Sequence, residues 1–398
     1  MSGTLYLLNG GTTLYPALSA DELYRTTPDP LTDQFTANAL SPQNSIVSAD
    51  LWGKGYAYLY QANACLEGIA QSAGISTGTK QRLRGEMLFT RSLCFFYLVQ
   101  LFGEVPLTLT SDYAQNAKLP RTDTEVIYTQ VVRDLQEAKE GLRNTAPLST
   151  RPSYDACASL LARVYLYQKN WAGAAAEADT VISSGLYRLE DLADVFLTGS
   201  RETIFALSPV IPGINTAEGL NFIPYDAAQV PLYAITDSLR LSFEPGDARK
   251  SAWLGKAEVN GQTYYYPYKY KLRGSDVATE NNVVLRLAEL YLVRAEARAQ
   301  LGEPDNAIED LNVIRGRARL APIPKGIAAA GVLPAIQHER RIELFVEWGH
   351  RWMDLTRSGQ ADAVLSREKS GWSGTDVLYP VPYSEILLNP ALVQNPGY

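Results

Sequence analysis

The chain has 398 residues, of which 46% are hydrophobic and 20% are charged, and its formal net charge is −7 at pH 7. This composition is that of an ordinary globular protein, and the length suffices for one large domain or two ordinary ones. The acidic balance, with no basic run to offset it, argues against nucleic acid as a partner. No stretch reaches the roughly 18 uninterrupted apolar residues of a membrane span.

Cysteine and histidine are too few and too scattered to build a common metal or catalytic site. The three cysteines, Cys65, Cys94 and Cys157, lie far apart within apolar helical patterns, where cysteine behaves as a small buried side chain. Only two histidines are present, which argues against a histidine-based metal or triad site. We therefore expect no metal and no cofactor.

The N-terminal region combines one helical pattern with loops. The start, MSGTLYLLNGG, has no basic segment and no cleavage site and is not a signal peptide. We expect either a cytosolic chain or one from which an export signal has been removed. Helical spacing recurs over residues 14–24, and three prolines then break the chain into loops. Such loops commonly carry binding groups, which makes Asp33 and Asn38 candidates, with ordinary solvated loop residues as the alternative.

Two long helices are predicted next, over residues 51–69 and from about Thr79 to Gly103. The Ser-Ala-Asp sequence at residues 48–50 can cap the first helix, and the glycine can end the second. Between them, residues 74–78 match the G-x-S-x-G motif. A nucleophile elbow needs a strand before the serine and a helix after it. Because this motif lies between two helices, we interpret it as a connection.

A helix–turn–helix pattern occurs twice, over residues 154–187 and 285–320. A further helix over residues 122–142 precedes the first copy, with Thr122 and Glu125 as its capping box. Small residues twelve positions apart would let the two helices of each copy approach closely. These residues are Ala162 with Ala174, and Ala295 with Ala307. The pattern is that of a tetratricopeptide repeat.

Residues 191–282 separate the two copies and lack helical spacing. Within them, residues 203–207 and 262–270 are predicted as short strands or extended loops. Two copies interrupted by other material indicate a scaffold with an insertion rather than a regular solenoid. We therefore predict an all-α, tetratricopeptide-like fold with a loop-rich insertion that contains a few short strands. We place the division between two regions at 1–190 and 191–398.

Aromatic residues are concentrated in this insertion. Consecutive tyrosines must point to opposite faces of an extended chain. A tyrosine ring offers an apolar plane with a hydroxyl group, which suits the C–H face and the hydroxyls of a sugar. The alternative is that the rings pack the insertion onto the helices. The residues are Tyr225, Tyr233, Trp253, Tyr264, Tyr265, Tyr266, Tyr268 and Tyr270.

Residues 337–359 combine charge and large apolar side chains more densely than any other stretch. Glu339, Glu343 and Glu347 form a row at i,i+4 spacing beside an apolar face. We expect the helix to end at Gly349 and to dock on its neighbours with partly buried ion pairs. Two arginines lie close enough in the sequence to neutralise the row locally. They are Arg340 and Arg351.

A catalytic role for this stretch is the less favoured interpretation. His338 and Glu339 begin like the H-E-x-x-H zinc motif, but the fifth position is Ile342 and the second ligand is missing. His350 lies too far along to replace it on the same helical face. Paired carboxylates could serve acid–base chemistry, yet structural networks gather charges in the same way. We predict a structural ion-pair helix and no enzymatic activity.

The C-terminal tail, from residue 376 to 398, is apolar but rich in proline and asparagine. Its prolines forbid a continuous helix, and we expect it to lie extended across the helical body. They are Pro380, Pro382, Pro390 and Pro396.

Several of these separated motifs together resemble the SusD/RagB family, the surface glycan-binding lipoproteins of outer-membrane nutrient uptake systems. The resemblance covers most of the helical chain. The motifs over residues 338–359 and 378–398, which occur in this order at the end of the given sequence, are specific to the family. The other matching segments are residues 83–107, 154–187 and 285–299.

The resemblance implies a mostly helical fold with tetratricopeptide-like repeats and an irregular, ligand-facing half. It implies an extracellular protein, lipid-anchored to the outer membrane, that caps a TonB-dependent (SusC-like) transporter and performs no catalysis. The family's mature chain starts at a lipidated cysteine, whereas the first cysteine here is Cys65. We therefore expect that the signal and the anchor have been removed.

Glycan-contacting residues differ between members of this family and lie in loops, so the candidate site rests on side-chain chemistry. We predict binding of glycans or oligosaccharides and their delivery to the transporter. The alternative is a tetratricopeptide scaffold that binds a protein or peptide without binding sugar. The rings predicted to stack on sugars are Trp253, Tyr264, Tyr266 and Tyr268, and the side chains predicted to bind hydroxyls are Asp33, Asn38 and Arg273.

Overall fold

The computed structural model describes residues 5–398, and its N-terminal segment differs from the predicted single helix. A buried helix, α1 (Gly11–Ser19), ends where Ala20 turns to an extended conformation and leads into strand β1 (Leu23–Arg25). The prediction of a helix over residues 14–24 is therefore wrong in its second half. A short helix, α2 (Asp33–Ala37), follows within the proline-rich loops.

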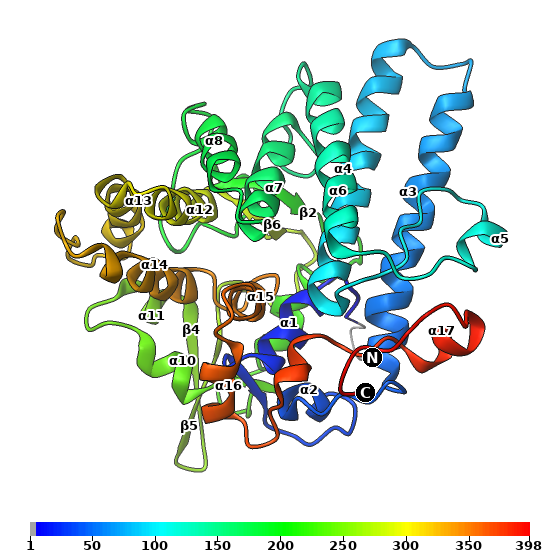
Figure 1. The fold of residues 1–398 in the computed structure, drawn as a ribbon. Helices are drawn as coiled ribbons and strands as arrows, with labels where there is room; N and C mark the ends of the chain where they lie inside the picture. Colours follow the sequence, from blue (N-terminus) through cyan, green and yellow to red (C-terminus); the bar gives the residue numbers. More distant parts are fainter. Residues whose placement is uncertain (1–4) are drawn as a thin grey trace.

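Three long helices then run side by side (Figure 1). A π-helical turn (Ile46–Gly53) leads directly into α3 (Lys54–Gln71), so the predicted cap at residues 48–50 is not used. Helix α4 (Thr77–Phe102) starts at Ser76, whose hydroxyl accepts the Thr79 N–H. Asp123, rather than Thr122, caps the third helix. That helix is α6 (Thr124–Leu142), and the short helix α5 (Tyr113–Asn116) precedes it.

The two predicted repeats are present, and they lie next to each other although the insertion separates them in the sequence. The first is α7 (Tyr154–Tyr167) with α8 (Trp171–Ile182), and the second is α12 (Leu287–Gln300) with α13 (Pro304–Arg317). Helix α12 packs against α8 as well as against α13. The four alanines that mark the repeats are fully buried, as close helix packing requires. The predicted mostly helical, tetratricopeptide-like fold is confirmed.

The insertion contains short strands and three short helices, the latter not predicted. In the described residues, the strands form three two-stranded antiparallel sheets, β1–β3, β2–β6 and β4–β5. Pairing of β2 with β6 joins the two ends of the insertion at the base of α12. The elements are β2 (Thr203–Leu207), α9 (Ala217–Phe222), β3 (Tyr233–Ile235), α10 (Asp237–Ser242), α11 (Ala248–Trp253), β4 (Leu254–Val259), β5 (Gln262–Pro267) and β6 (Asn282–Arg286).

The C-terminal helices correct two expectations. Helix α14 (Ala329–Glu343) ends six residues before Gly349, because Val346 and Trp348 adopt left-handed conformations with φ of 48° and 44°. The tail also contains a short helix after Pro382, so it is not extended throughout. The remaining elements are α15 (His350–Arg357), α16 (Ala361–Glu368), a 3₁₀ turn (Gly374–Val377) and α17 (Tyr383–Leu388).

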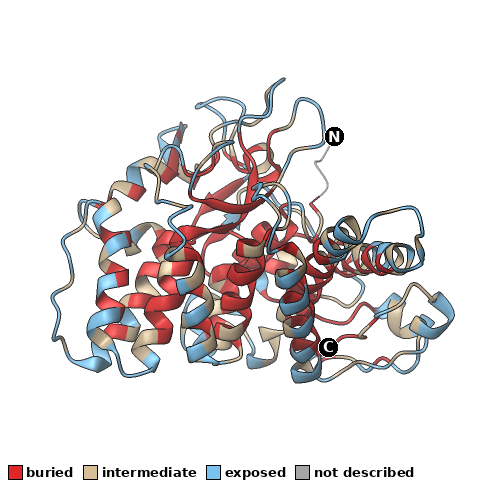
Figure 2. Cartoon of the chain, turned by 90° about the horizontal axis from the view of Figure 1, so that it is seen from above, coloured by how far each residue is buried: buried red, intermediate tan, exposed pale blue. Residues whose placement is uncertain are grey.

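Buried residues line the facing sides of the helices and the strands between them (Figure 2). The larger core cluster runs from Leu5 to Leu392, and a smaller one joins α12, α13 and α14. Because the larger cluster includes residues from both sides of position 190, the two regions share a core, and their division at that position stays a prediction. Within residues 5–398, no helix is long and apolar enough to span a membrane.

Candidate functional site

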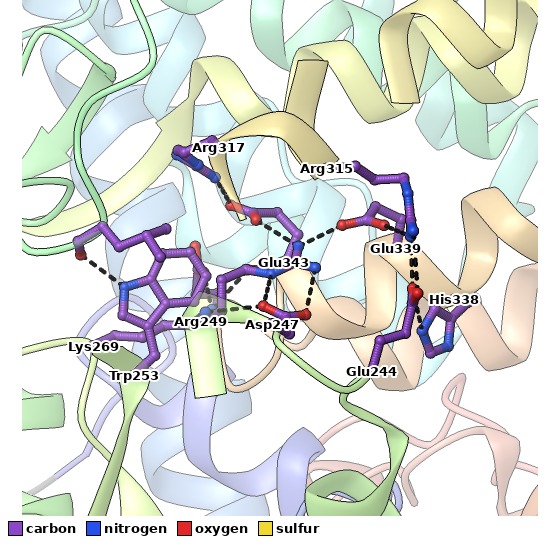
Figure 3. Close-up of polar contacts among 12 residues, drawn as sticks. Glu244, Asp247, Arg249, Trp253, Lys269, Arg315, Arg317, His338, Glu339 and Glu343 are labelled. Atoms are coloured by element: carbon purple, nitrogen blue, oxygen red, sulfur yellow. Dashed lines mark hydrogen bonds and ion pairs between the residues drawn. The ribbon is translucent and has the colours of Figure 1, made fainter. Parts of the chain in front are cut away.

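The glutamates of the predicted row, Glu339, Glu343 and Glu347, are buried and bind cations in a connected network, part of which Figure 3 shows. Arg249 Nη1 lies 2.5 Å from Glu339 Oε1 and donates to Glu343 Oε2 at 3.0 Å. Arg286 donates to Glu343 Oε1 at 2.6 Å and to Glu347 Oε2 at 2.8 Å. Further cations contact the same carboxylates. They are Lys269, Arg315 and Arg317.

The partners of the glutamate row are therefore distant in sequence, which corrects the prediction of local neutralisation. Arg340 pairs with Asp354, with 2.8 Å between Nε and Oδ2, and Arg351 pairs with Asp21, with 2.7 Å between Nε and Oδ1. The cations that neutralise the row come instead from α11, β6, α13 and the segment after β5. The network consequently ties the insertion to α13 and α14, which follow it in the sequence.

Burial and pairing set the charge states in this network. Burial alone would raise the pKa of the Glu343 carboxyl, but the guanidinium groups of Arg317, Arg286 and Arg249 hold it well below its usual range. Burial lowers the pKa of Lys269 to about 8, although Glu347 opposes the shift. Every carboxylate of the row is thus matched by cations, as a structural network requires.

The residues that resembled parts of catalytic motifs contact other parts of the protein in ways that support its structure. His338 Nε2 lies 3.7 Å from a Glu244 carboxylate oxygen, and burial lowers the pKa of His350 to about 4. Ser76, at the centre of the G-x-S-x-G match, is the N-cap of α4. In the part of the chain that the structure describes, no group of three or more His, Cys, Asp or Glu is placed to hold a metal ion.

A polar cavity of about 550 Å³ opens between the N-terminal segment and the insertion. Segments from residues 5–50 form one side, and segments from residues 220–233 together with Arg273 form the other. Both acidic and basic side chains reach it, alongside neutral donors and acceptors. The polar lining consists of Arg25, Thr27, Asp29, Thr32, Asp50, Asn221, Gln229 and Arg273.

Tyr225 and Arg273 form the exposed edge of this cavity. The Arg273 guanidinium lies over the Tyr225 ring, 3.8 Å from its centroid. Arg273 Nη1 also donates to the carbonyl oxygens of Leu220 at 2.6 Å and Ile223 at 2.8 Å, which fixes it at the end of α9. The tyrosine side chain is still 76% exposed. One face of an aromatic ring is therefore covered by a cation, and the other is open to solvent.

The opposite wall carries an ordered ion pair. Arg25 Nη1 lies 3.0 Å from Asp29 Oδ2 and 3.3 Å from the Thr32 hydroxyl. A hydrogen bond from the Thr32 backbone N–H, assisted by Arg25, lowers the pKa of the Asp29 carboxyl. Partial burial raises the pKa of Asp50. The cavity therefore offers fixed donors and acceptors of both kinds, which suits a ligand with many hydroxyl groups.

Two of the four predicted stacking residues are buried, and we correct the prediction for them. Trp253 is fully buried, donates its indole N–H to the Leu192 carbonyl at 2.8 Å, and lies beneath the Lys269 ammonium group. Tyr266 is covered because it packs across the hairpin on Gly255 and against Tyr268. Neither ring offers a face to a ligand in this structure.

The other predicted residues do not form one site. Tyr264 and Tyr268 are partly exposed on the β4–β5 hairpin and its continuation, outside the polar cavity. Asp33 accepts the backbone N–H of Asp29 at 2.9 Å and thereby lies next to the cavity wall. Asn38 is buried at the left-handed end of α2, and its side-chain amide has no partner among the described residues. Arg273 alone of the seven lines the cavity.

Sequence reasoning did not select most of the cavity residues. Tyr225 was noted only as one aromatic residue of the insertion, and Arg25, Asp29 and Asp50 carried no recognised motif. These residues share only their place in the folded chain. They come from two segments that are distant in the sequence and that meet at the cavity. A proline before Tyr225 is the one local sign that its ring stands on a loop.

Comparisons with known proteins agree with this architecture. A sequence profile of the SusD family matches residues 248–398, and one described as "Starch-binding associating with outer membrane" matches residues 29–166. The SusD-like protein P25 of Formosa agariphila is 25% identical, over 99% of this chain and 90% of its own length. The starch-binding protein SusD of Bacteroides thetaiotaomicron is 23% identical, over 83% of this chain and 75% of its own length.

Solved structures share the fold. A SusD superfamily protein from Bacteroides vulgatus superposes with a TM-score of 0.85 at 22% identity, covering 98% of this chain and 95% of that one. A laminarin-binding SusD-like protein superposes with a TM-score of 0.78 at 24% identity, covering 97% of this chain and 94% of that one. The two profile matches, the relatives along nearly the whole chain and the shared fold lead to one conclusion: this chain belongs to the SusD/RagB family.

Proposed function

We propose that this protein binds an oligosaccharide or polysaccharide in the polar cavity between its N-terminal segment and its insertion. The observation that carries the proposal is the Tyr225 ring, exposed at the cavity edge and backed by Arg273. Support also comes from two members of the same fold, which are described as binding starch and laminarin. Binding without chemical change is the proposed role.

The proposed recognition combines ring stacking with hydrogen bonds. The open face of Tyr225 would lie against the C–H face of a sugar ring. The guanidinium groups of Arg25 and Arg273 would donate to hydroxyl oxygens, and the carboxylates of Asp29 and Asp50 would accept from hydroxyl groups. Such contacts replace hydrogen bonds to water, so each adds little affinity by itself. A ligand of several sugar units is therefore expected to bind better than a monosaccharide.

We further propose delivery of the bound glycan to a SusC-like, TonB-dependent transporter, from a lipid-anchored position on the extracellular face of the outer membrane. Family membership supports this proposal, together with the profile description that mentions association with the outer membrane. Co-purification of the protein with a SusC-like transporter from native membranes would test the partnership. Recovery of each protein without the other, under conditions that preserve membrane complexes, would count against it.

The alternative role, a tetratricopeptide scaffold for a protein or peptide, is less well supported. It would be favoured by sealed aromatic residues and by the absence of a cavity between the insertion and the helices. Tyr266 and Tyr270 are indeed buried, but Tyr225 is exposed. A cavity of about 550 Å³ also opens between the two parts of the chain. Glycan binding therefore remains the function that the geometry supports best.

Affinity electrophoresis and calorimetry against a panel of soluble polysaccharides test the proposed function. We expect at least one polysaccharide to bind, and the variant Tyr225→Ala to bind it about tenfold more weakly. A matched control is Tyr113→Ala, because Tyr113 is 82% exposed on α5 and does not line the cavity. Retention of binding by Tyr225→Ala would overturn the assignment of the site. Absence of binding to every glycan would overturn the function.

A further inference from the structure

A second cavity, of about 340 Å³, lies beside the polar one, and the two share a wall. Leu220 and Asn221, on helix α9, line both cavities. The second cavity differs in chemistry, because none of its lining residues among those described is charged. Its apolar walls are formed by Leu8, Leu207, Pro209, Val210, Ile211 and Ile214.

The shared wall is held by the same residue that forms the edge of the polar cavity. Thr216 caps the start of α9 by accepting the Gly219 N–H at 3.0 Å, and Arg273 binds two carbonyl oxygens at its end. Gly274 lies close to the backbone of Gly213. A Cβ atom on residue 274 would fall 2.5 Å from the Gly213 carbonyl oxygen. The loop that carries the apolar wall is thereby positioned against the loop that carries Arg273.

Two side chains of the apolar wall are unusually exposed for their kind. Val210 is 88% exposed and Ile211 is 55% exposed, on a loop that stands over the second cavity. Exposed aliphatic side chains beside a neutral cavity are typical of a surface that a ligand covers. Because the neighbouring cavity is polar, a single ligand that spans both must carry a polar part and a neutral, apolar part.

We infer that the preferred ligand is a glycan that carries an acyl substituent, held with its hydroxyl groups in the polar cavity and its acyl group in the neutral one. This inference rests on the proposed glycan-binding function. An ester- or amide-linked acyl group combines an apolar end with an uncharged carbonyl, which matches the walls. A sulfate, phosphate or carboxylate substituent would be left without a cation in the neutral cavity, and its burial there would be unfavourable.

Two lining residues offer one donor, which suits the carbonyl oxygen of an acyl group, and one acceptor, which suits the N–H of an amide-linked one. Asn215 Oδ1 accepts the Thr279 N–H at 2.9 Å, which leaves its Nδ2 without a partner among the described residues. Asn282 Nδ2 donates to both Glu218 carboxylate oxygens at 2.7 Å, and Asn282 Oδ1 has no partner among the described residues. Both atoms are covered in this structure, so a small side-chain movement would be needed before they reach a ligand.

Matched pairs of glycans test this inference by calorimetry. One pair is O-acetylated glucomannan and the same polymer after alkaline deacetylation, and the other is a chitin hexasaccharide and cellohexaose, which has the same linkage, no acetamido groups and no charge. The two pairs distinguish ester-linked from amide-linked acyl groups. We expect the acylated member of at least one pair to bind about tenfold more tightly. The variant Ile211→Asp, which places a charge in the neutral cavity, should remove that difference.

Val126→Asp is the control, since Val126 is 52% exposed on α6 and lines neither cavity. The control should keep the preference for the acylated member. Equal binding of both members of every pair would overturn this inference while leaving the proposed function in place. Preserved preference in Ile211→Asp would overturn the assignment of the second cavity. Absence of binding to all glycans would overturn the proposed function and this inference with it.

Discussion

Two regions of this molecule hold many charged side chains, and they hold them in opposite ways. In the network around α14, Glu343 is fully buried and contacts Arg249, Arg286 and Arg317. At the polar cavity, Arg25 contacts Asp29 at the wall of an open space. The charges of the network pair with one another inside the protein. The charges at the cavity border an open space and keep some of their hydrogen-bonding capacity.

The comparison shows two ways in which one chain can place its charged side chains. In the buried network, neighbouring cations hold the pKa values of Glu343 and Glu347 below their usual range, so neither carboxylate is poised to exchange a proton near neutral pH. At the cavity, the groups are partly exposed and are suited to hydrogen bonding with sugar hydroxyls. The network fixes the insertion on the helices, and the cavity forms where the insertion meets the N-terminal segment.

Removing a central arginine of the network should give the largest effect. Arg286→Met deletes the cation that Glu202, Glu343 and Glu347 share and leaves these buried carboxylates only partly neutralised. We expect a loss of about 3–5 kcal/mol in the free energy of unfolding, measured by urea denaturation. Arg143→Met, at an exposed ion pair with Glu140, should leave the denaturation midpoint unchanged. Equal midpoints for the two variants would show that the network is not structural.

Truncating the buried indole tests whether Trp253 belongs to the frame or to the site. Trp253→Ala should lower the free energy of unfolding by about 3–4 kcal/mol, because it creates a cavity between Phe196 and Phe345. Glycan affinity of the folded protein, measured by calorimetry well below the melting temperature, should change by less than about twofold. A large loss of affinity without a loss of stability would indicate that Trp253 contacts the ligand.

A buried acid, Glu22, lies directly before β1 and predicts a pH dependence. Burial, reinforced by Asp21, raises the pKa of Glu22 from 4.5 to about 8, while the Val346 N–H opposes the shift. The folded state therefore binds more protons than the unfolded state between these values, and stability falls as pH rises through this window. Glu22→Gln should remove this contribution and gain about 1–3 kcal/mol relative to wild type between pH 5 and pH 8.

Paired denaturation curves of wild type and Glu22→Gln across that pH range check the sign. The difference between the two proteins isolates Glu22 from the other titrating groups, provided that the amide keeps the 3.1 Å contact that the carboxylate makes with the Val346 N–H. A constant difference from pH 5 to pH 8 would mean that Glu22 is ionised in the folded protein.

The smallest effect is expected from a conservative change at the cavity edge. Arg273→Lys keeps the charge but loses the planar group that covers Tyr225 and binds the Leu220 and Ile223 carbonyls. We expect glycan affinity to fall about three- to fivefold by calorimetry, with little change in the melting temperature. Unchanged affinity would confine the role of Arg273 to holding α9.

The helical frame could be predicted because its signals are local. The twelve-residue spacing between Ala162 and Ala174, and between Ala295 and Ala307, places both repeats correctly. Left-handed conformations at Val346 and Trp348 carry no such signal, since these residue types rarely adopt them. Tertiary packing imposes these conformations, and the predicted helix consequently ended six residues too late.

The candidate site could not be predicted to the same degree, because its residues meet only in the folded chain. Alternation along β5 indicates that Tyr264 and Tyr266 share a face, but not that Gly255 on β4 lets the Tyr266 ring lie flat on the hairpin. Likewise, only the proline before Tyr225 locally distinguishes this exposed ring from buried Trp253. Aromatic chemistry suggests the class of ligand that we propose, whereas burial decides which rings can touch such a ligand.

The most direct test is a crystal structure of the protein with the tightest-binding oligosaccharide from the panel. We predict that a sugar ring will lie on the open face of Tyr225 and that hydroxyl groups will contact Arg273 and the Arg25–Asp29 pair. Sugar bound at another surface, such as the partly exposed tyrosines of the β4–β5 hairpin, with the polar cavity filled only by water, would contradict this account.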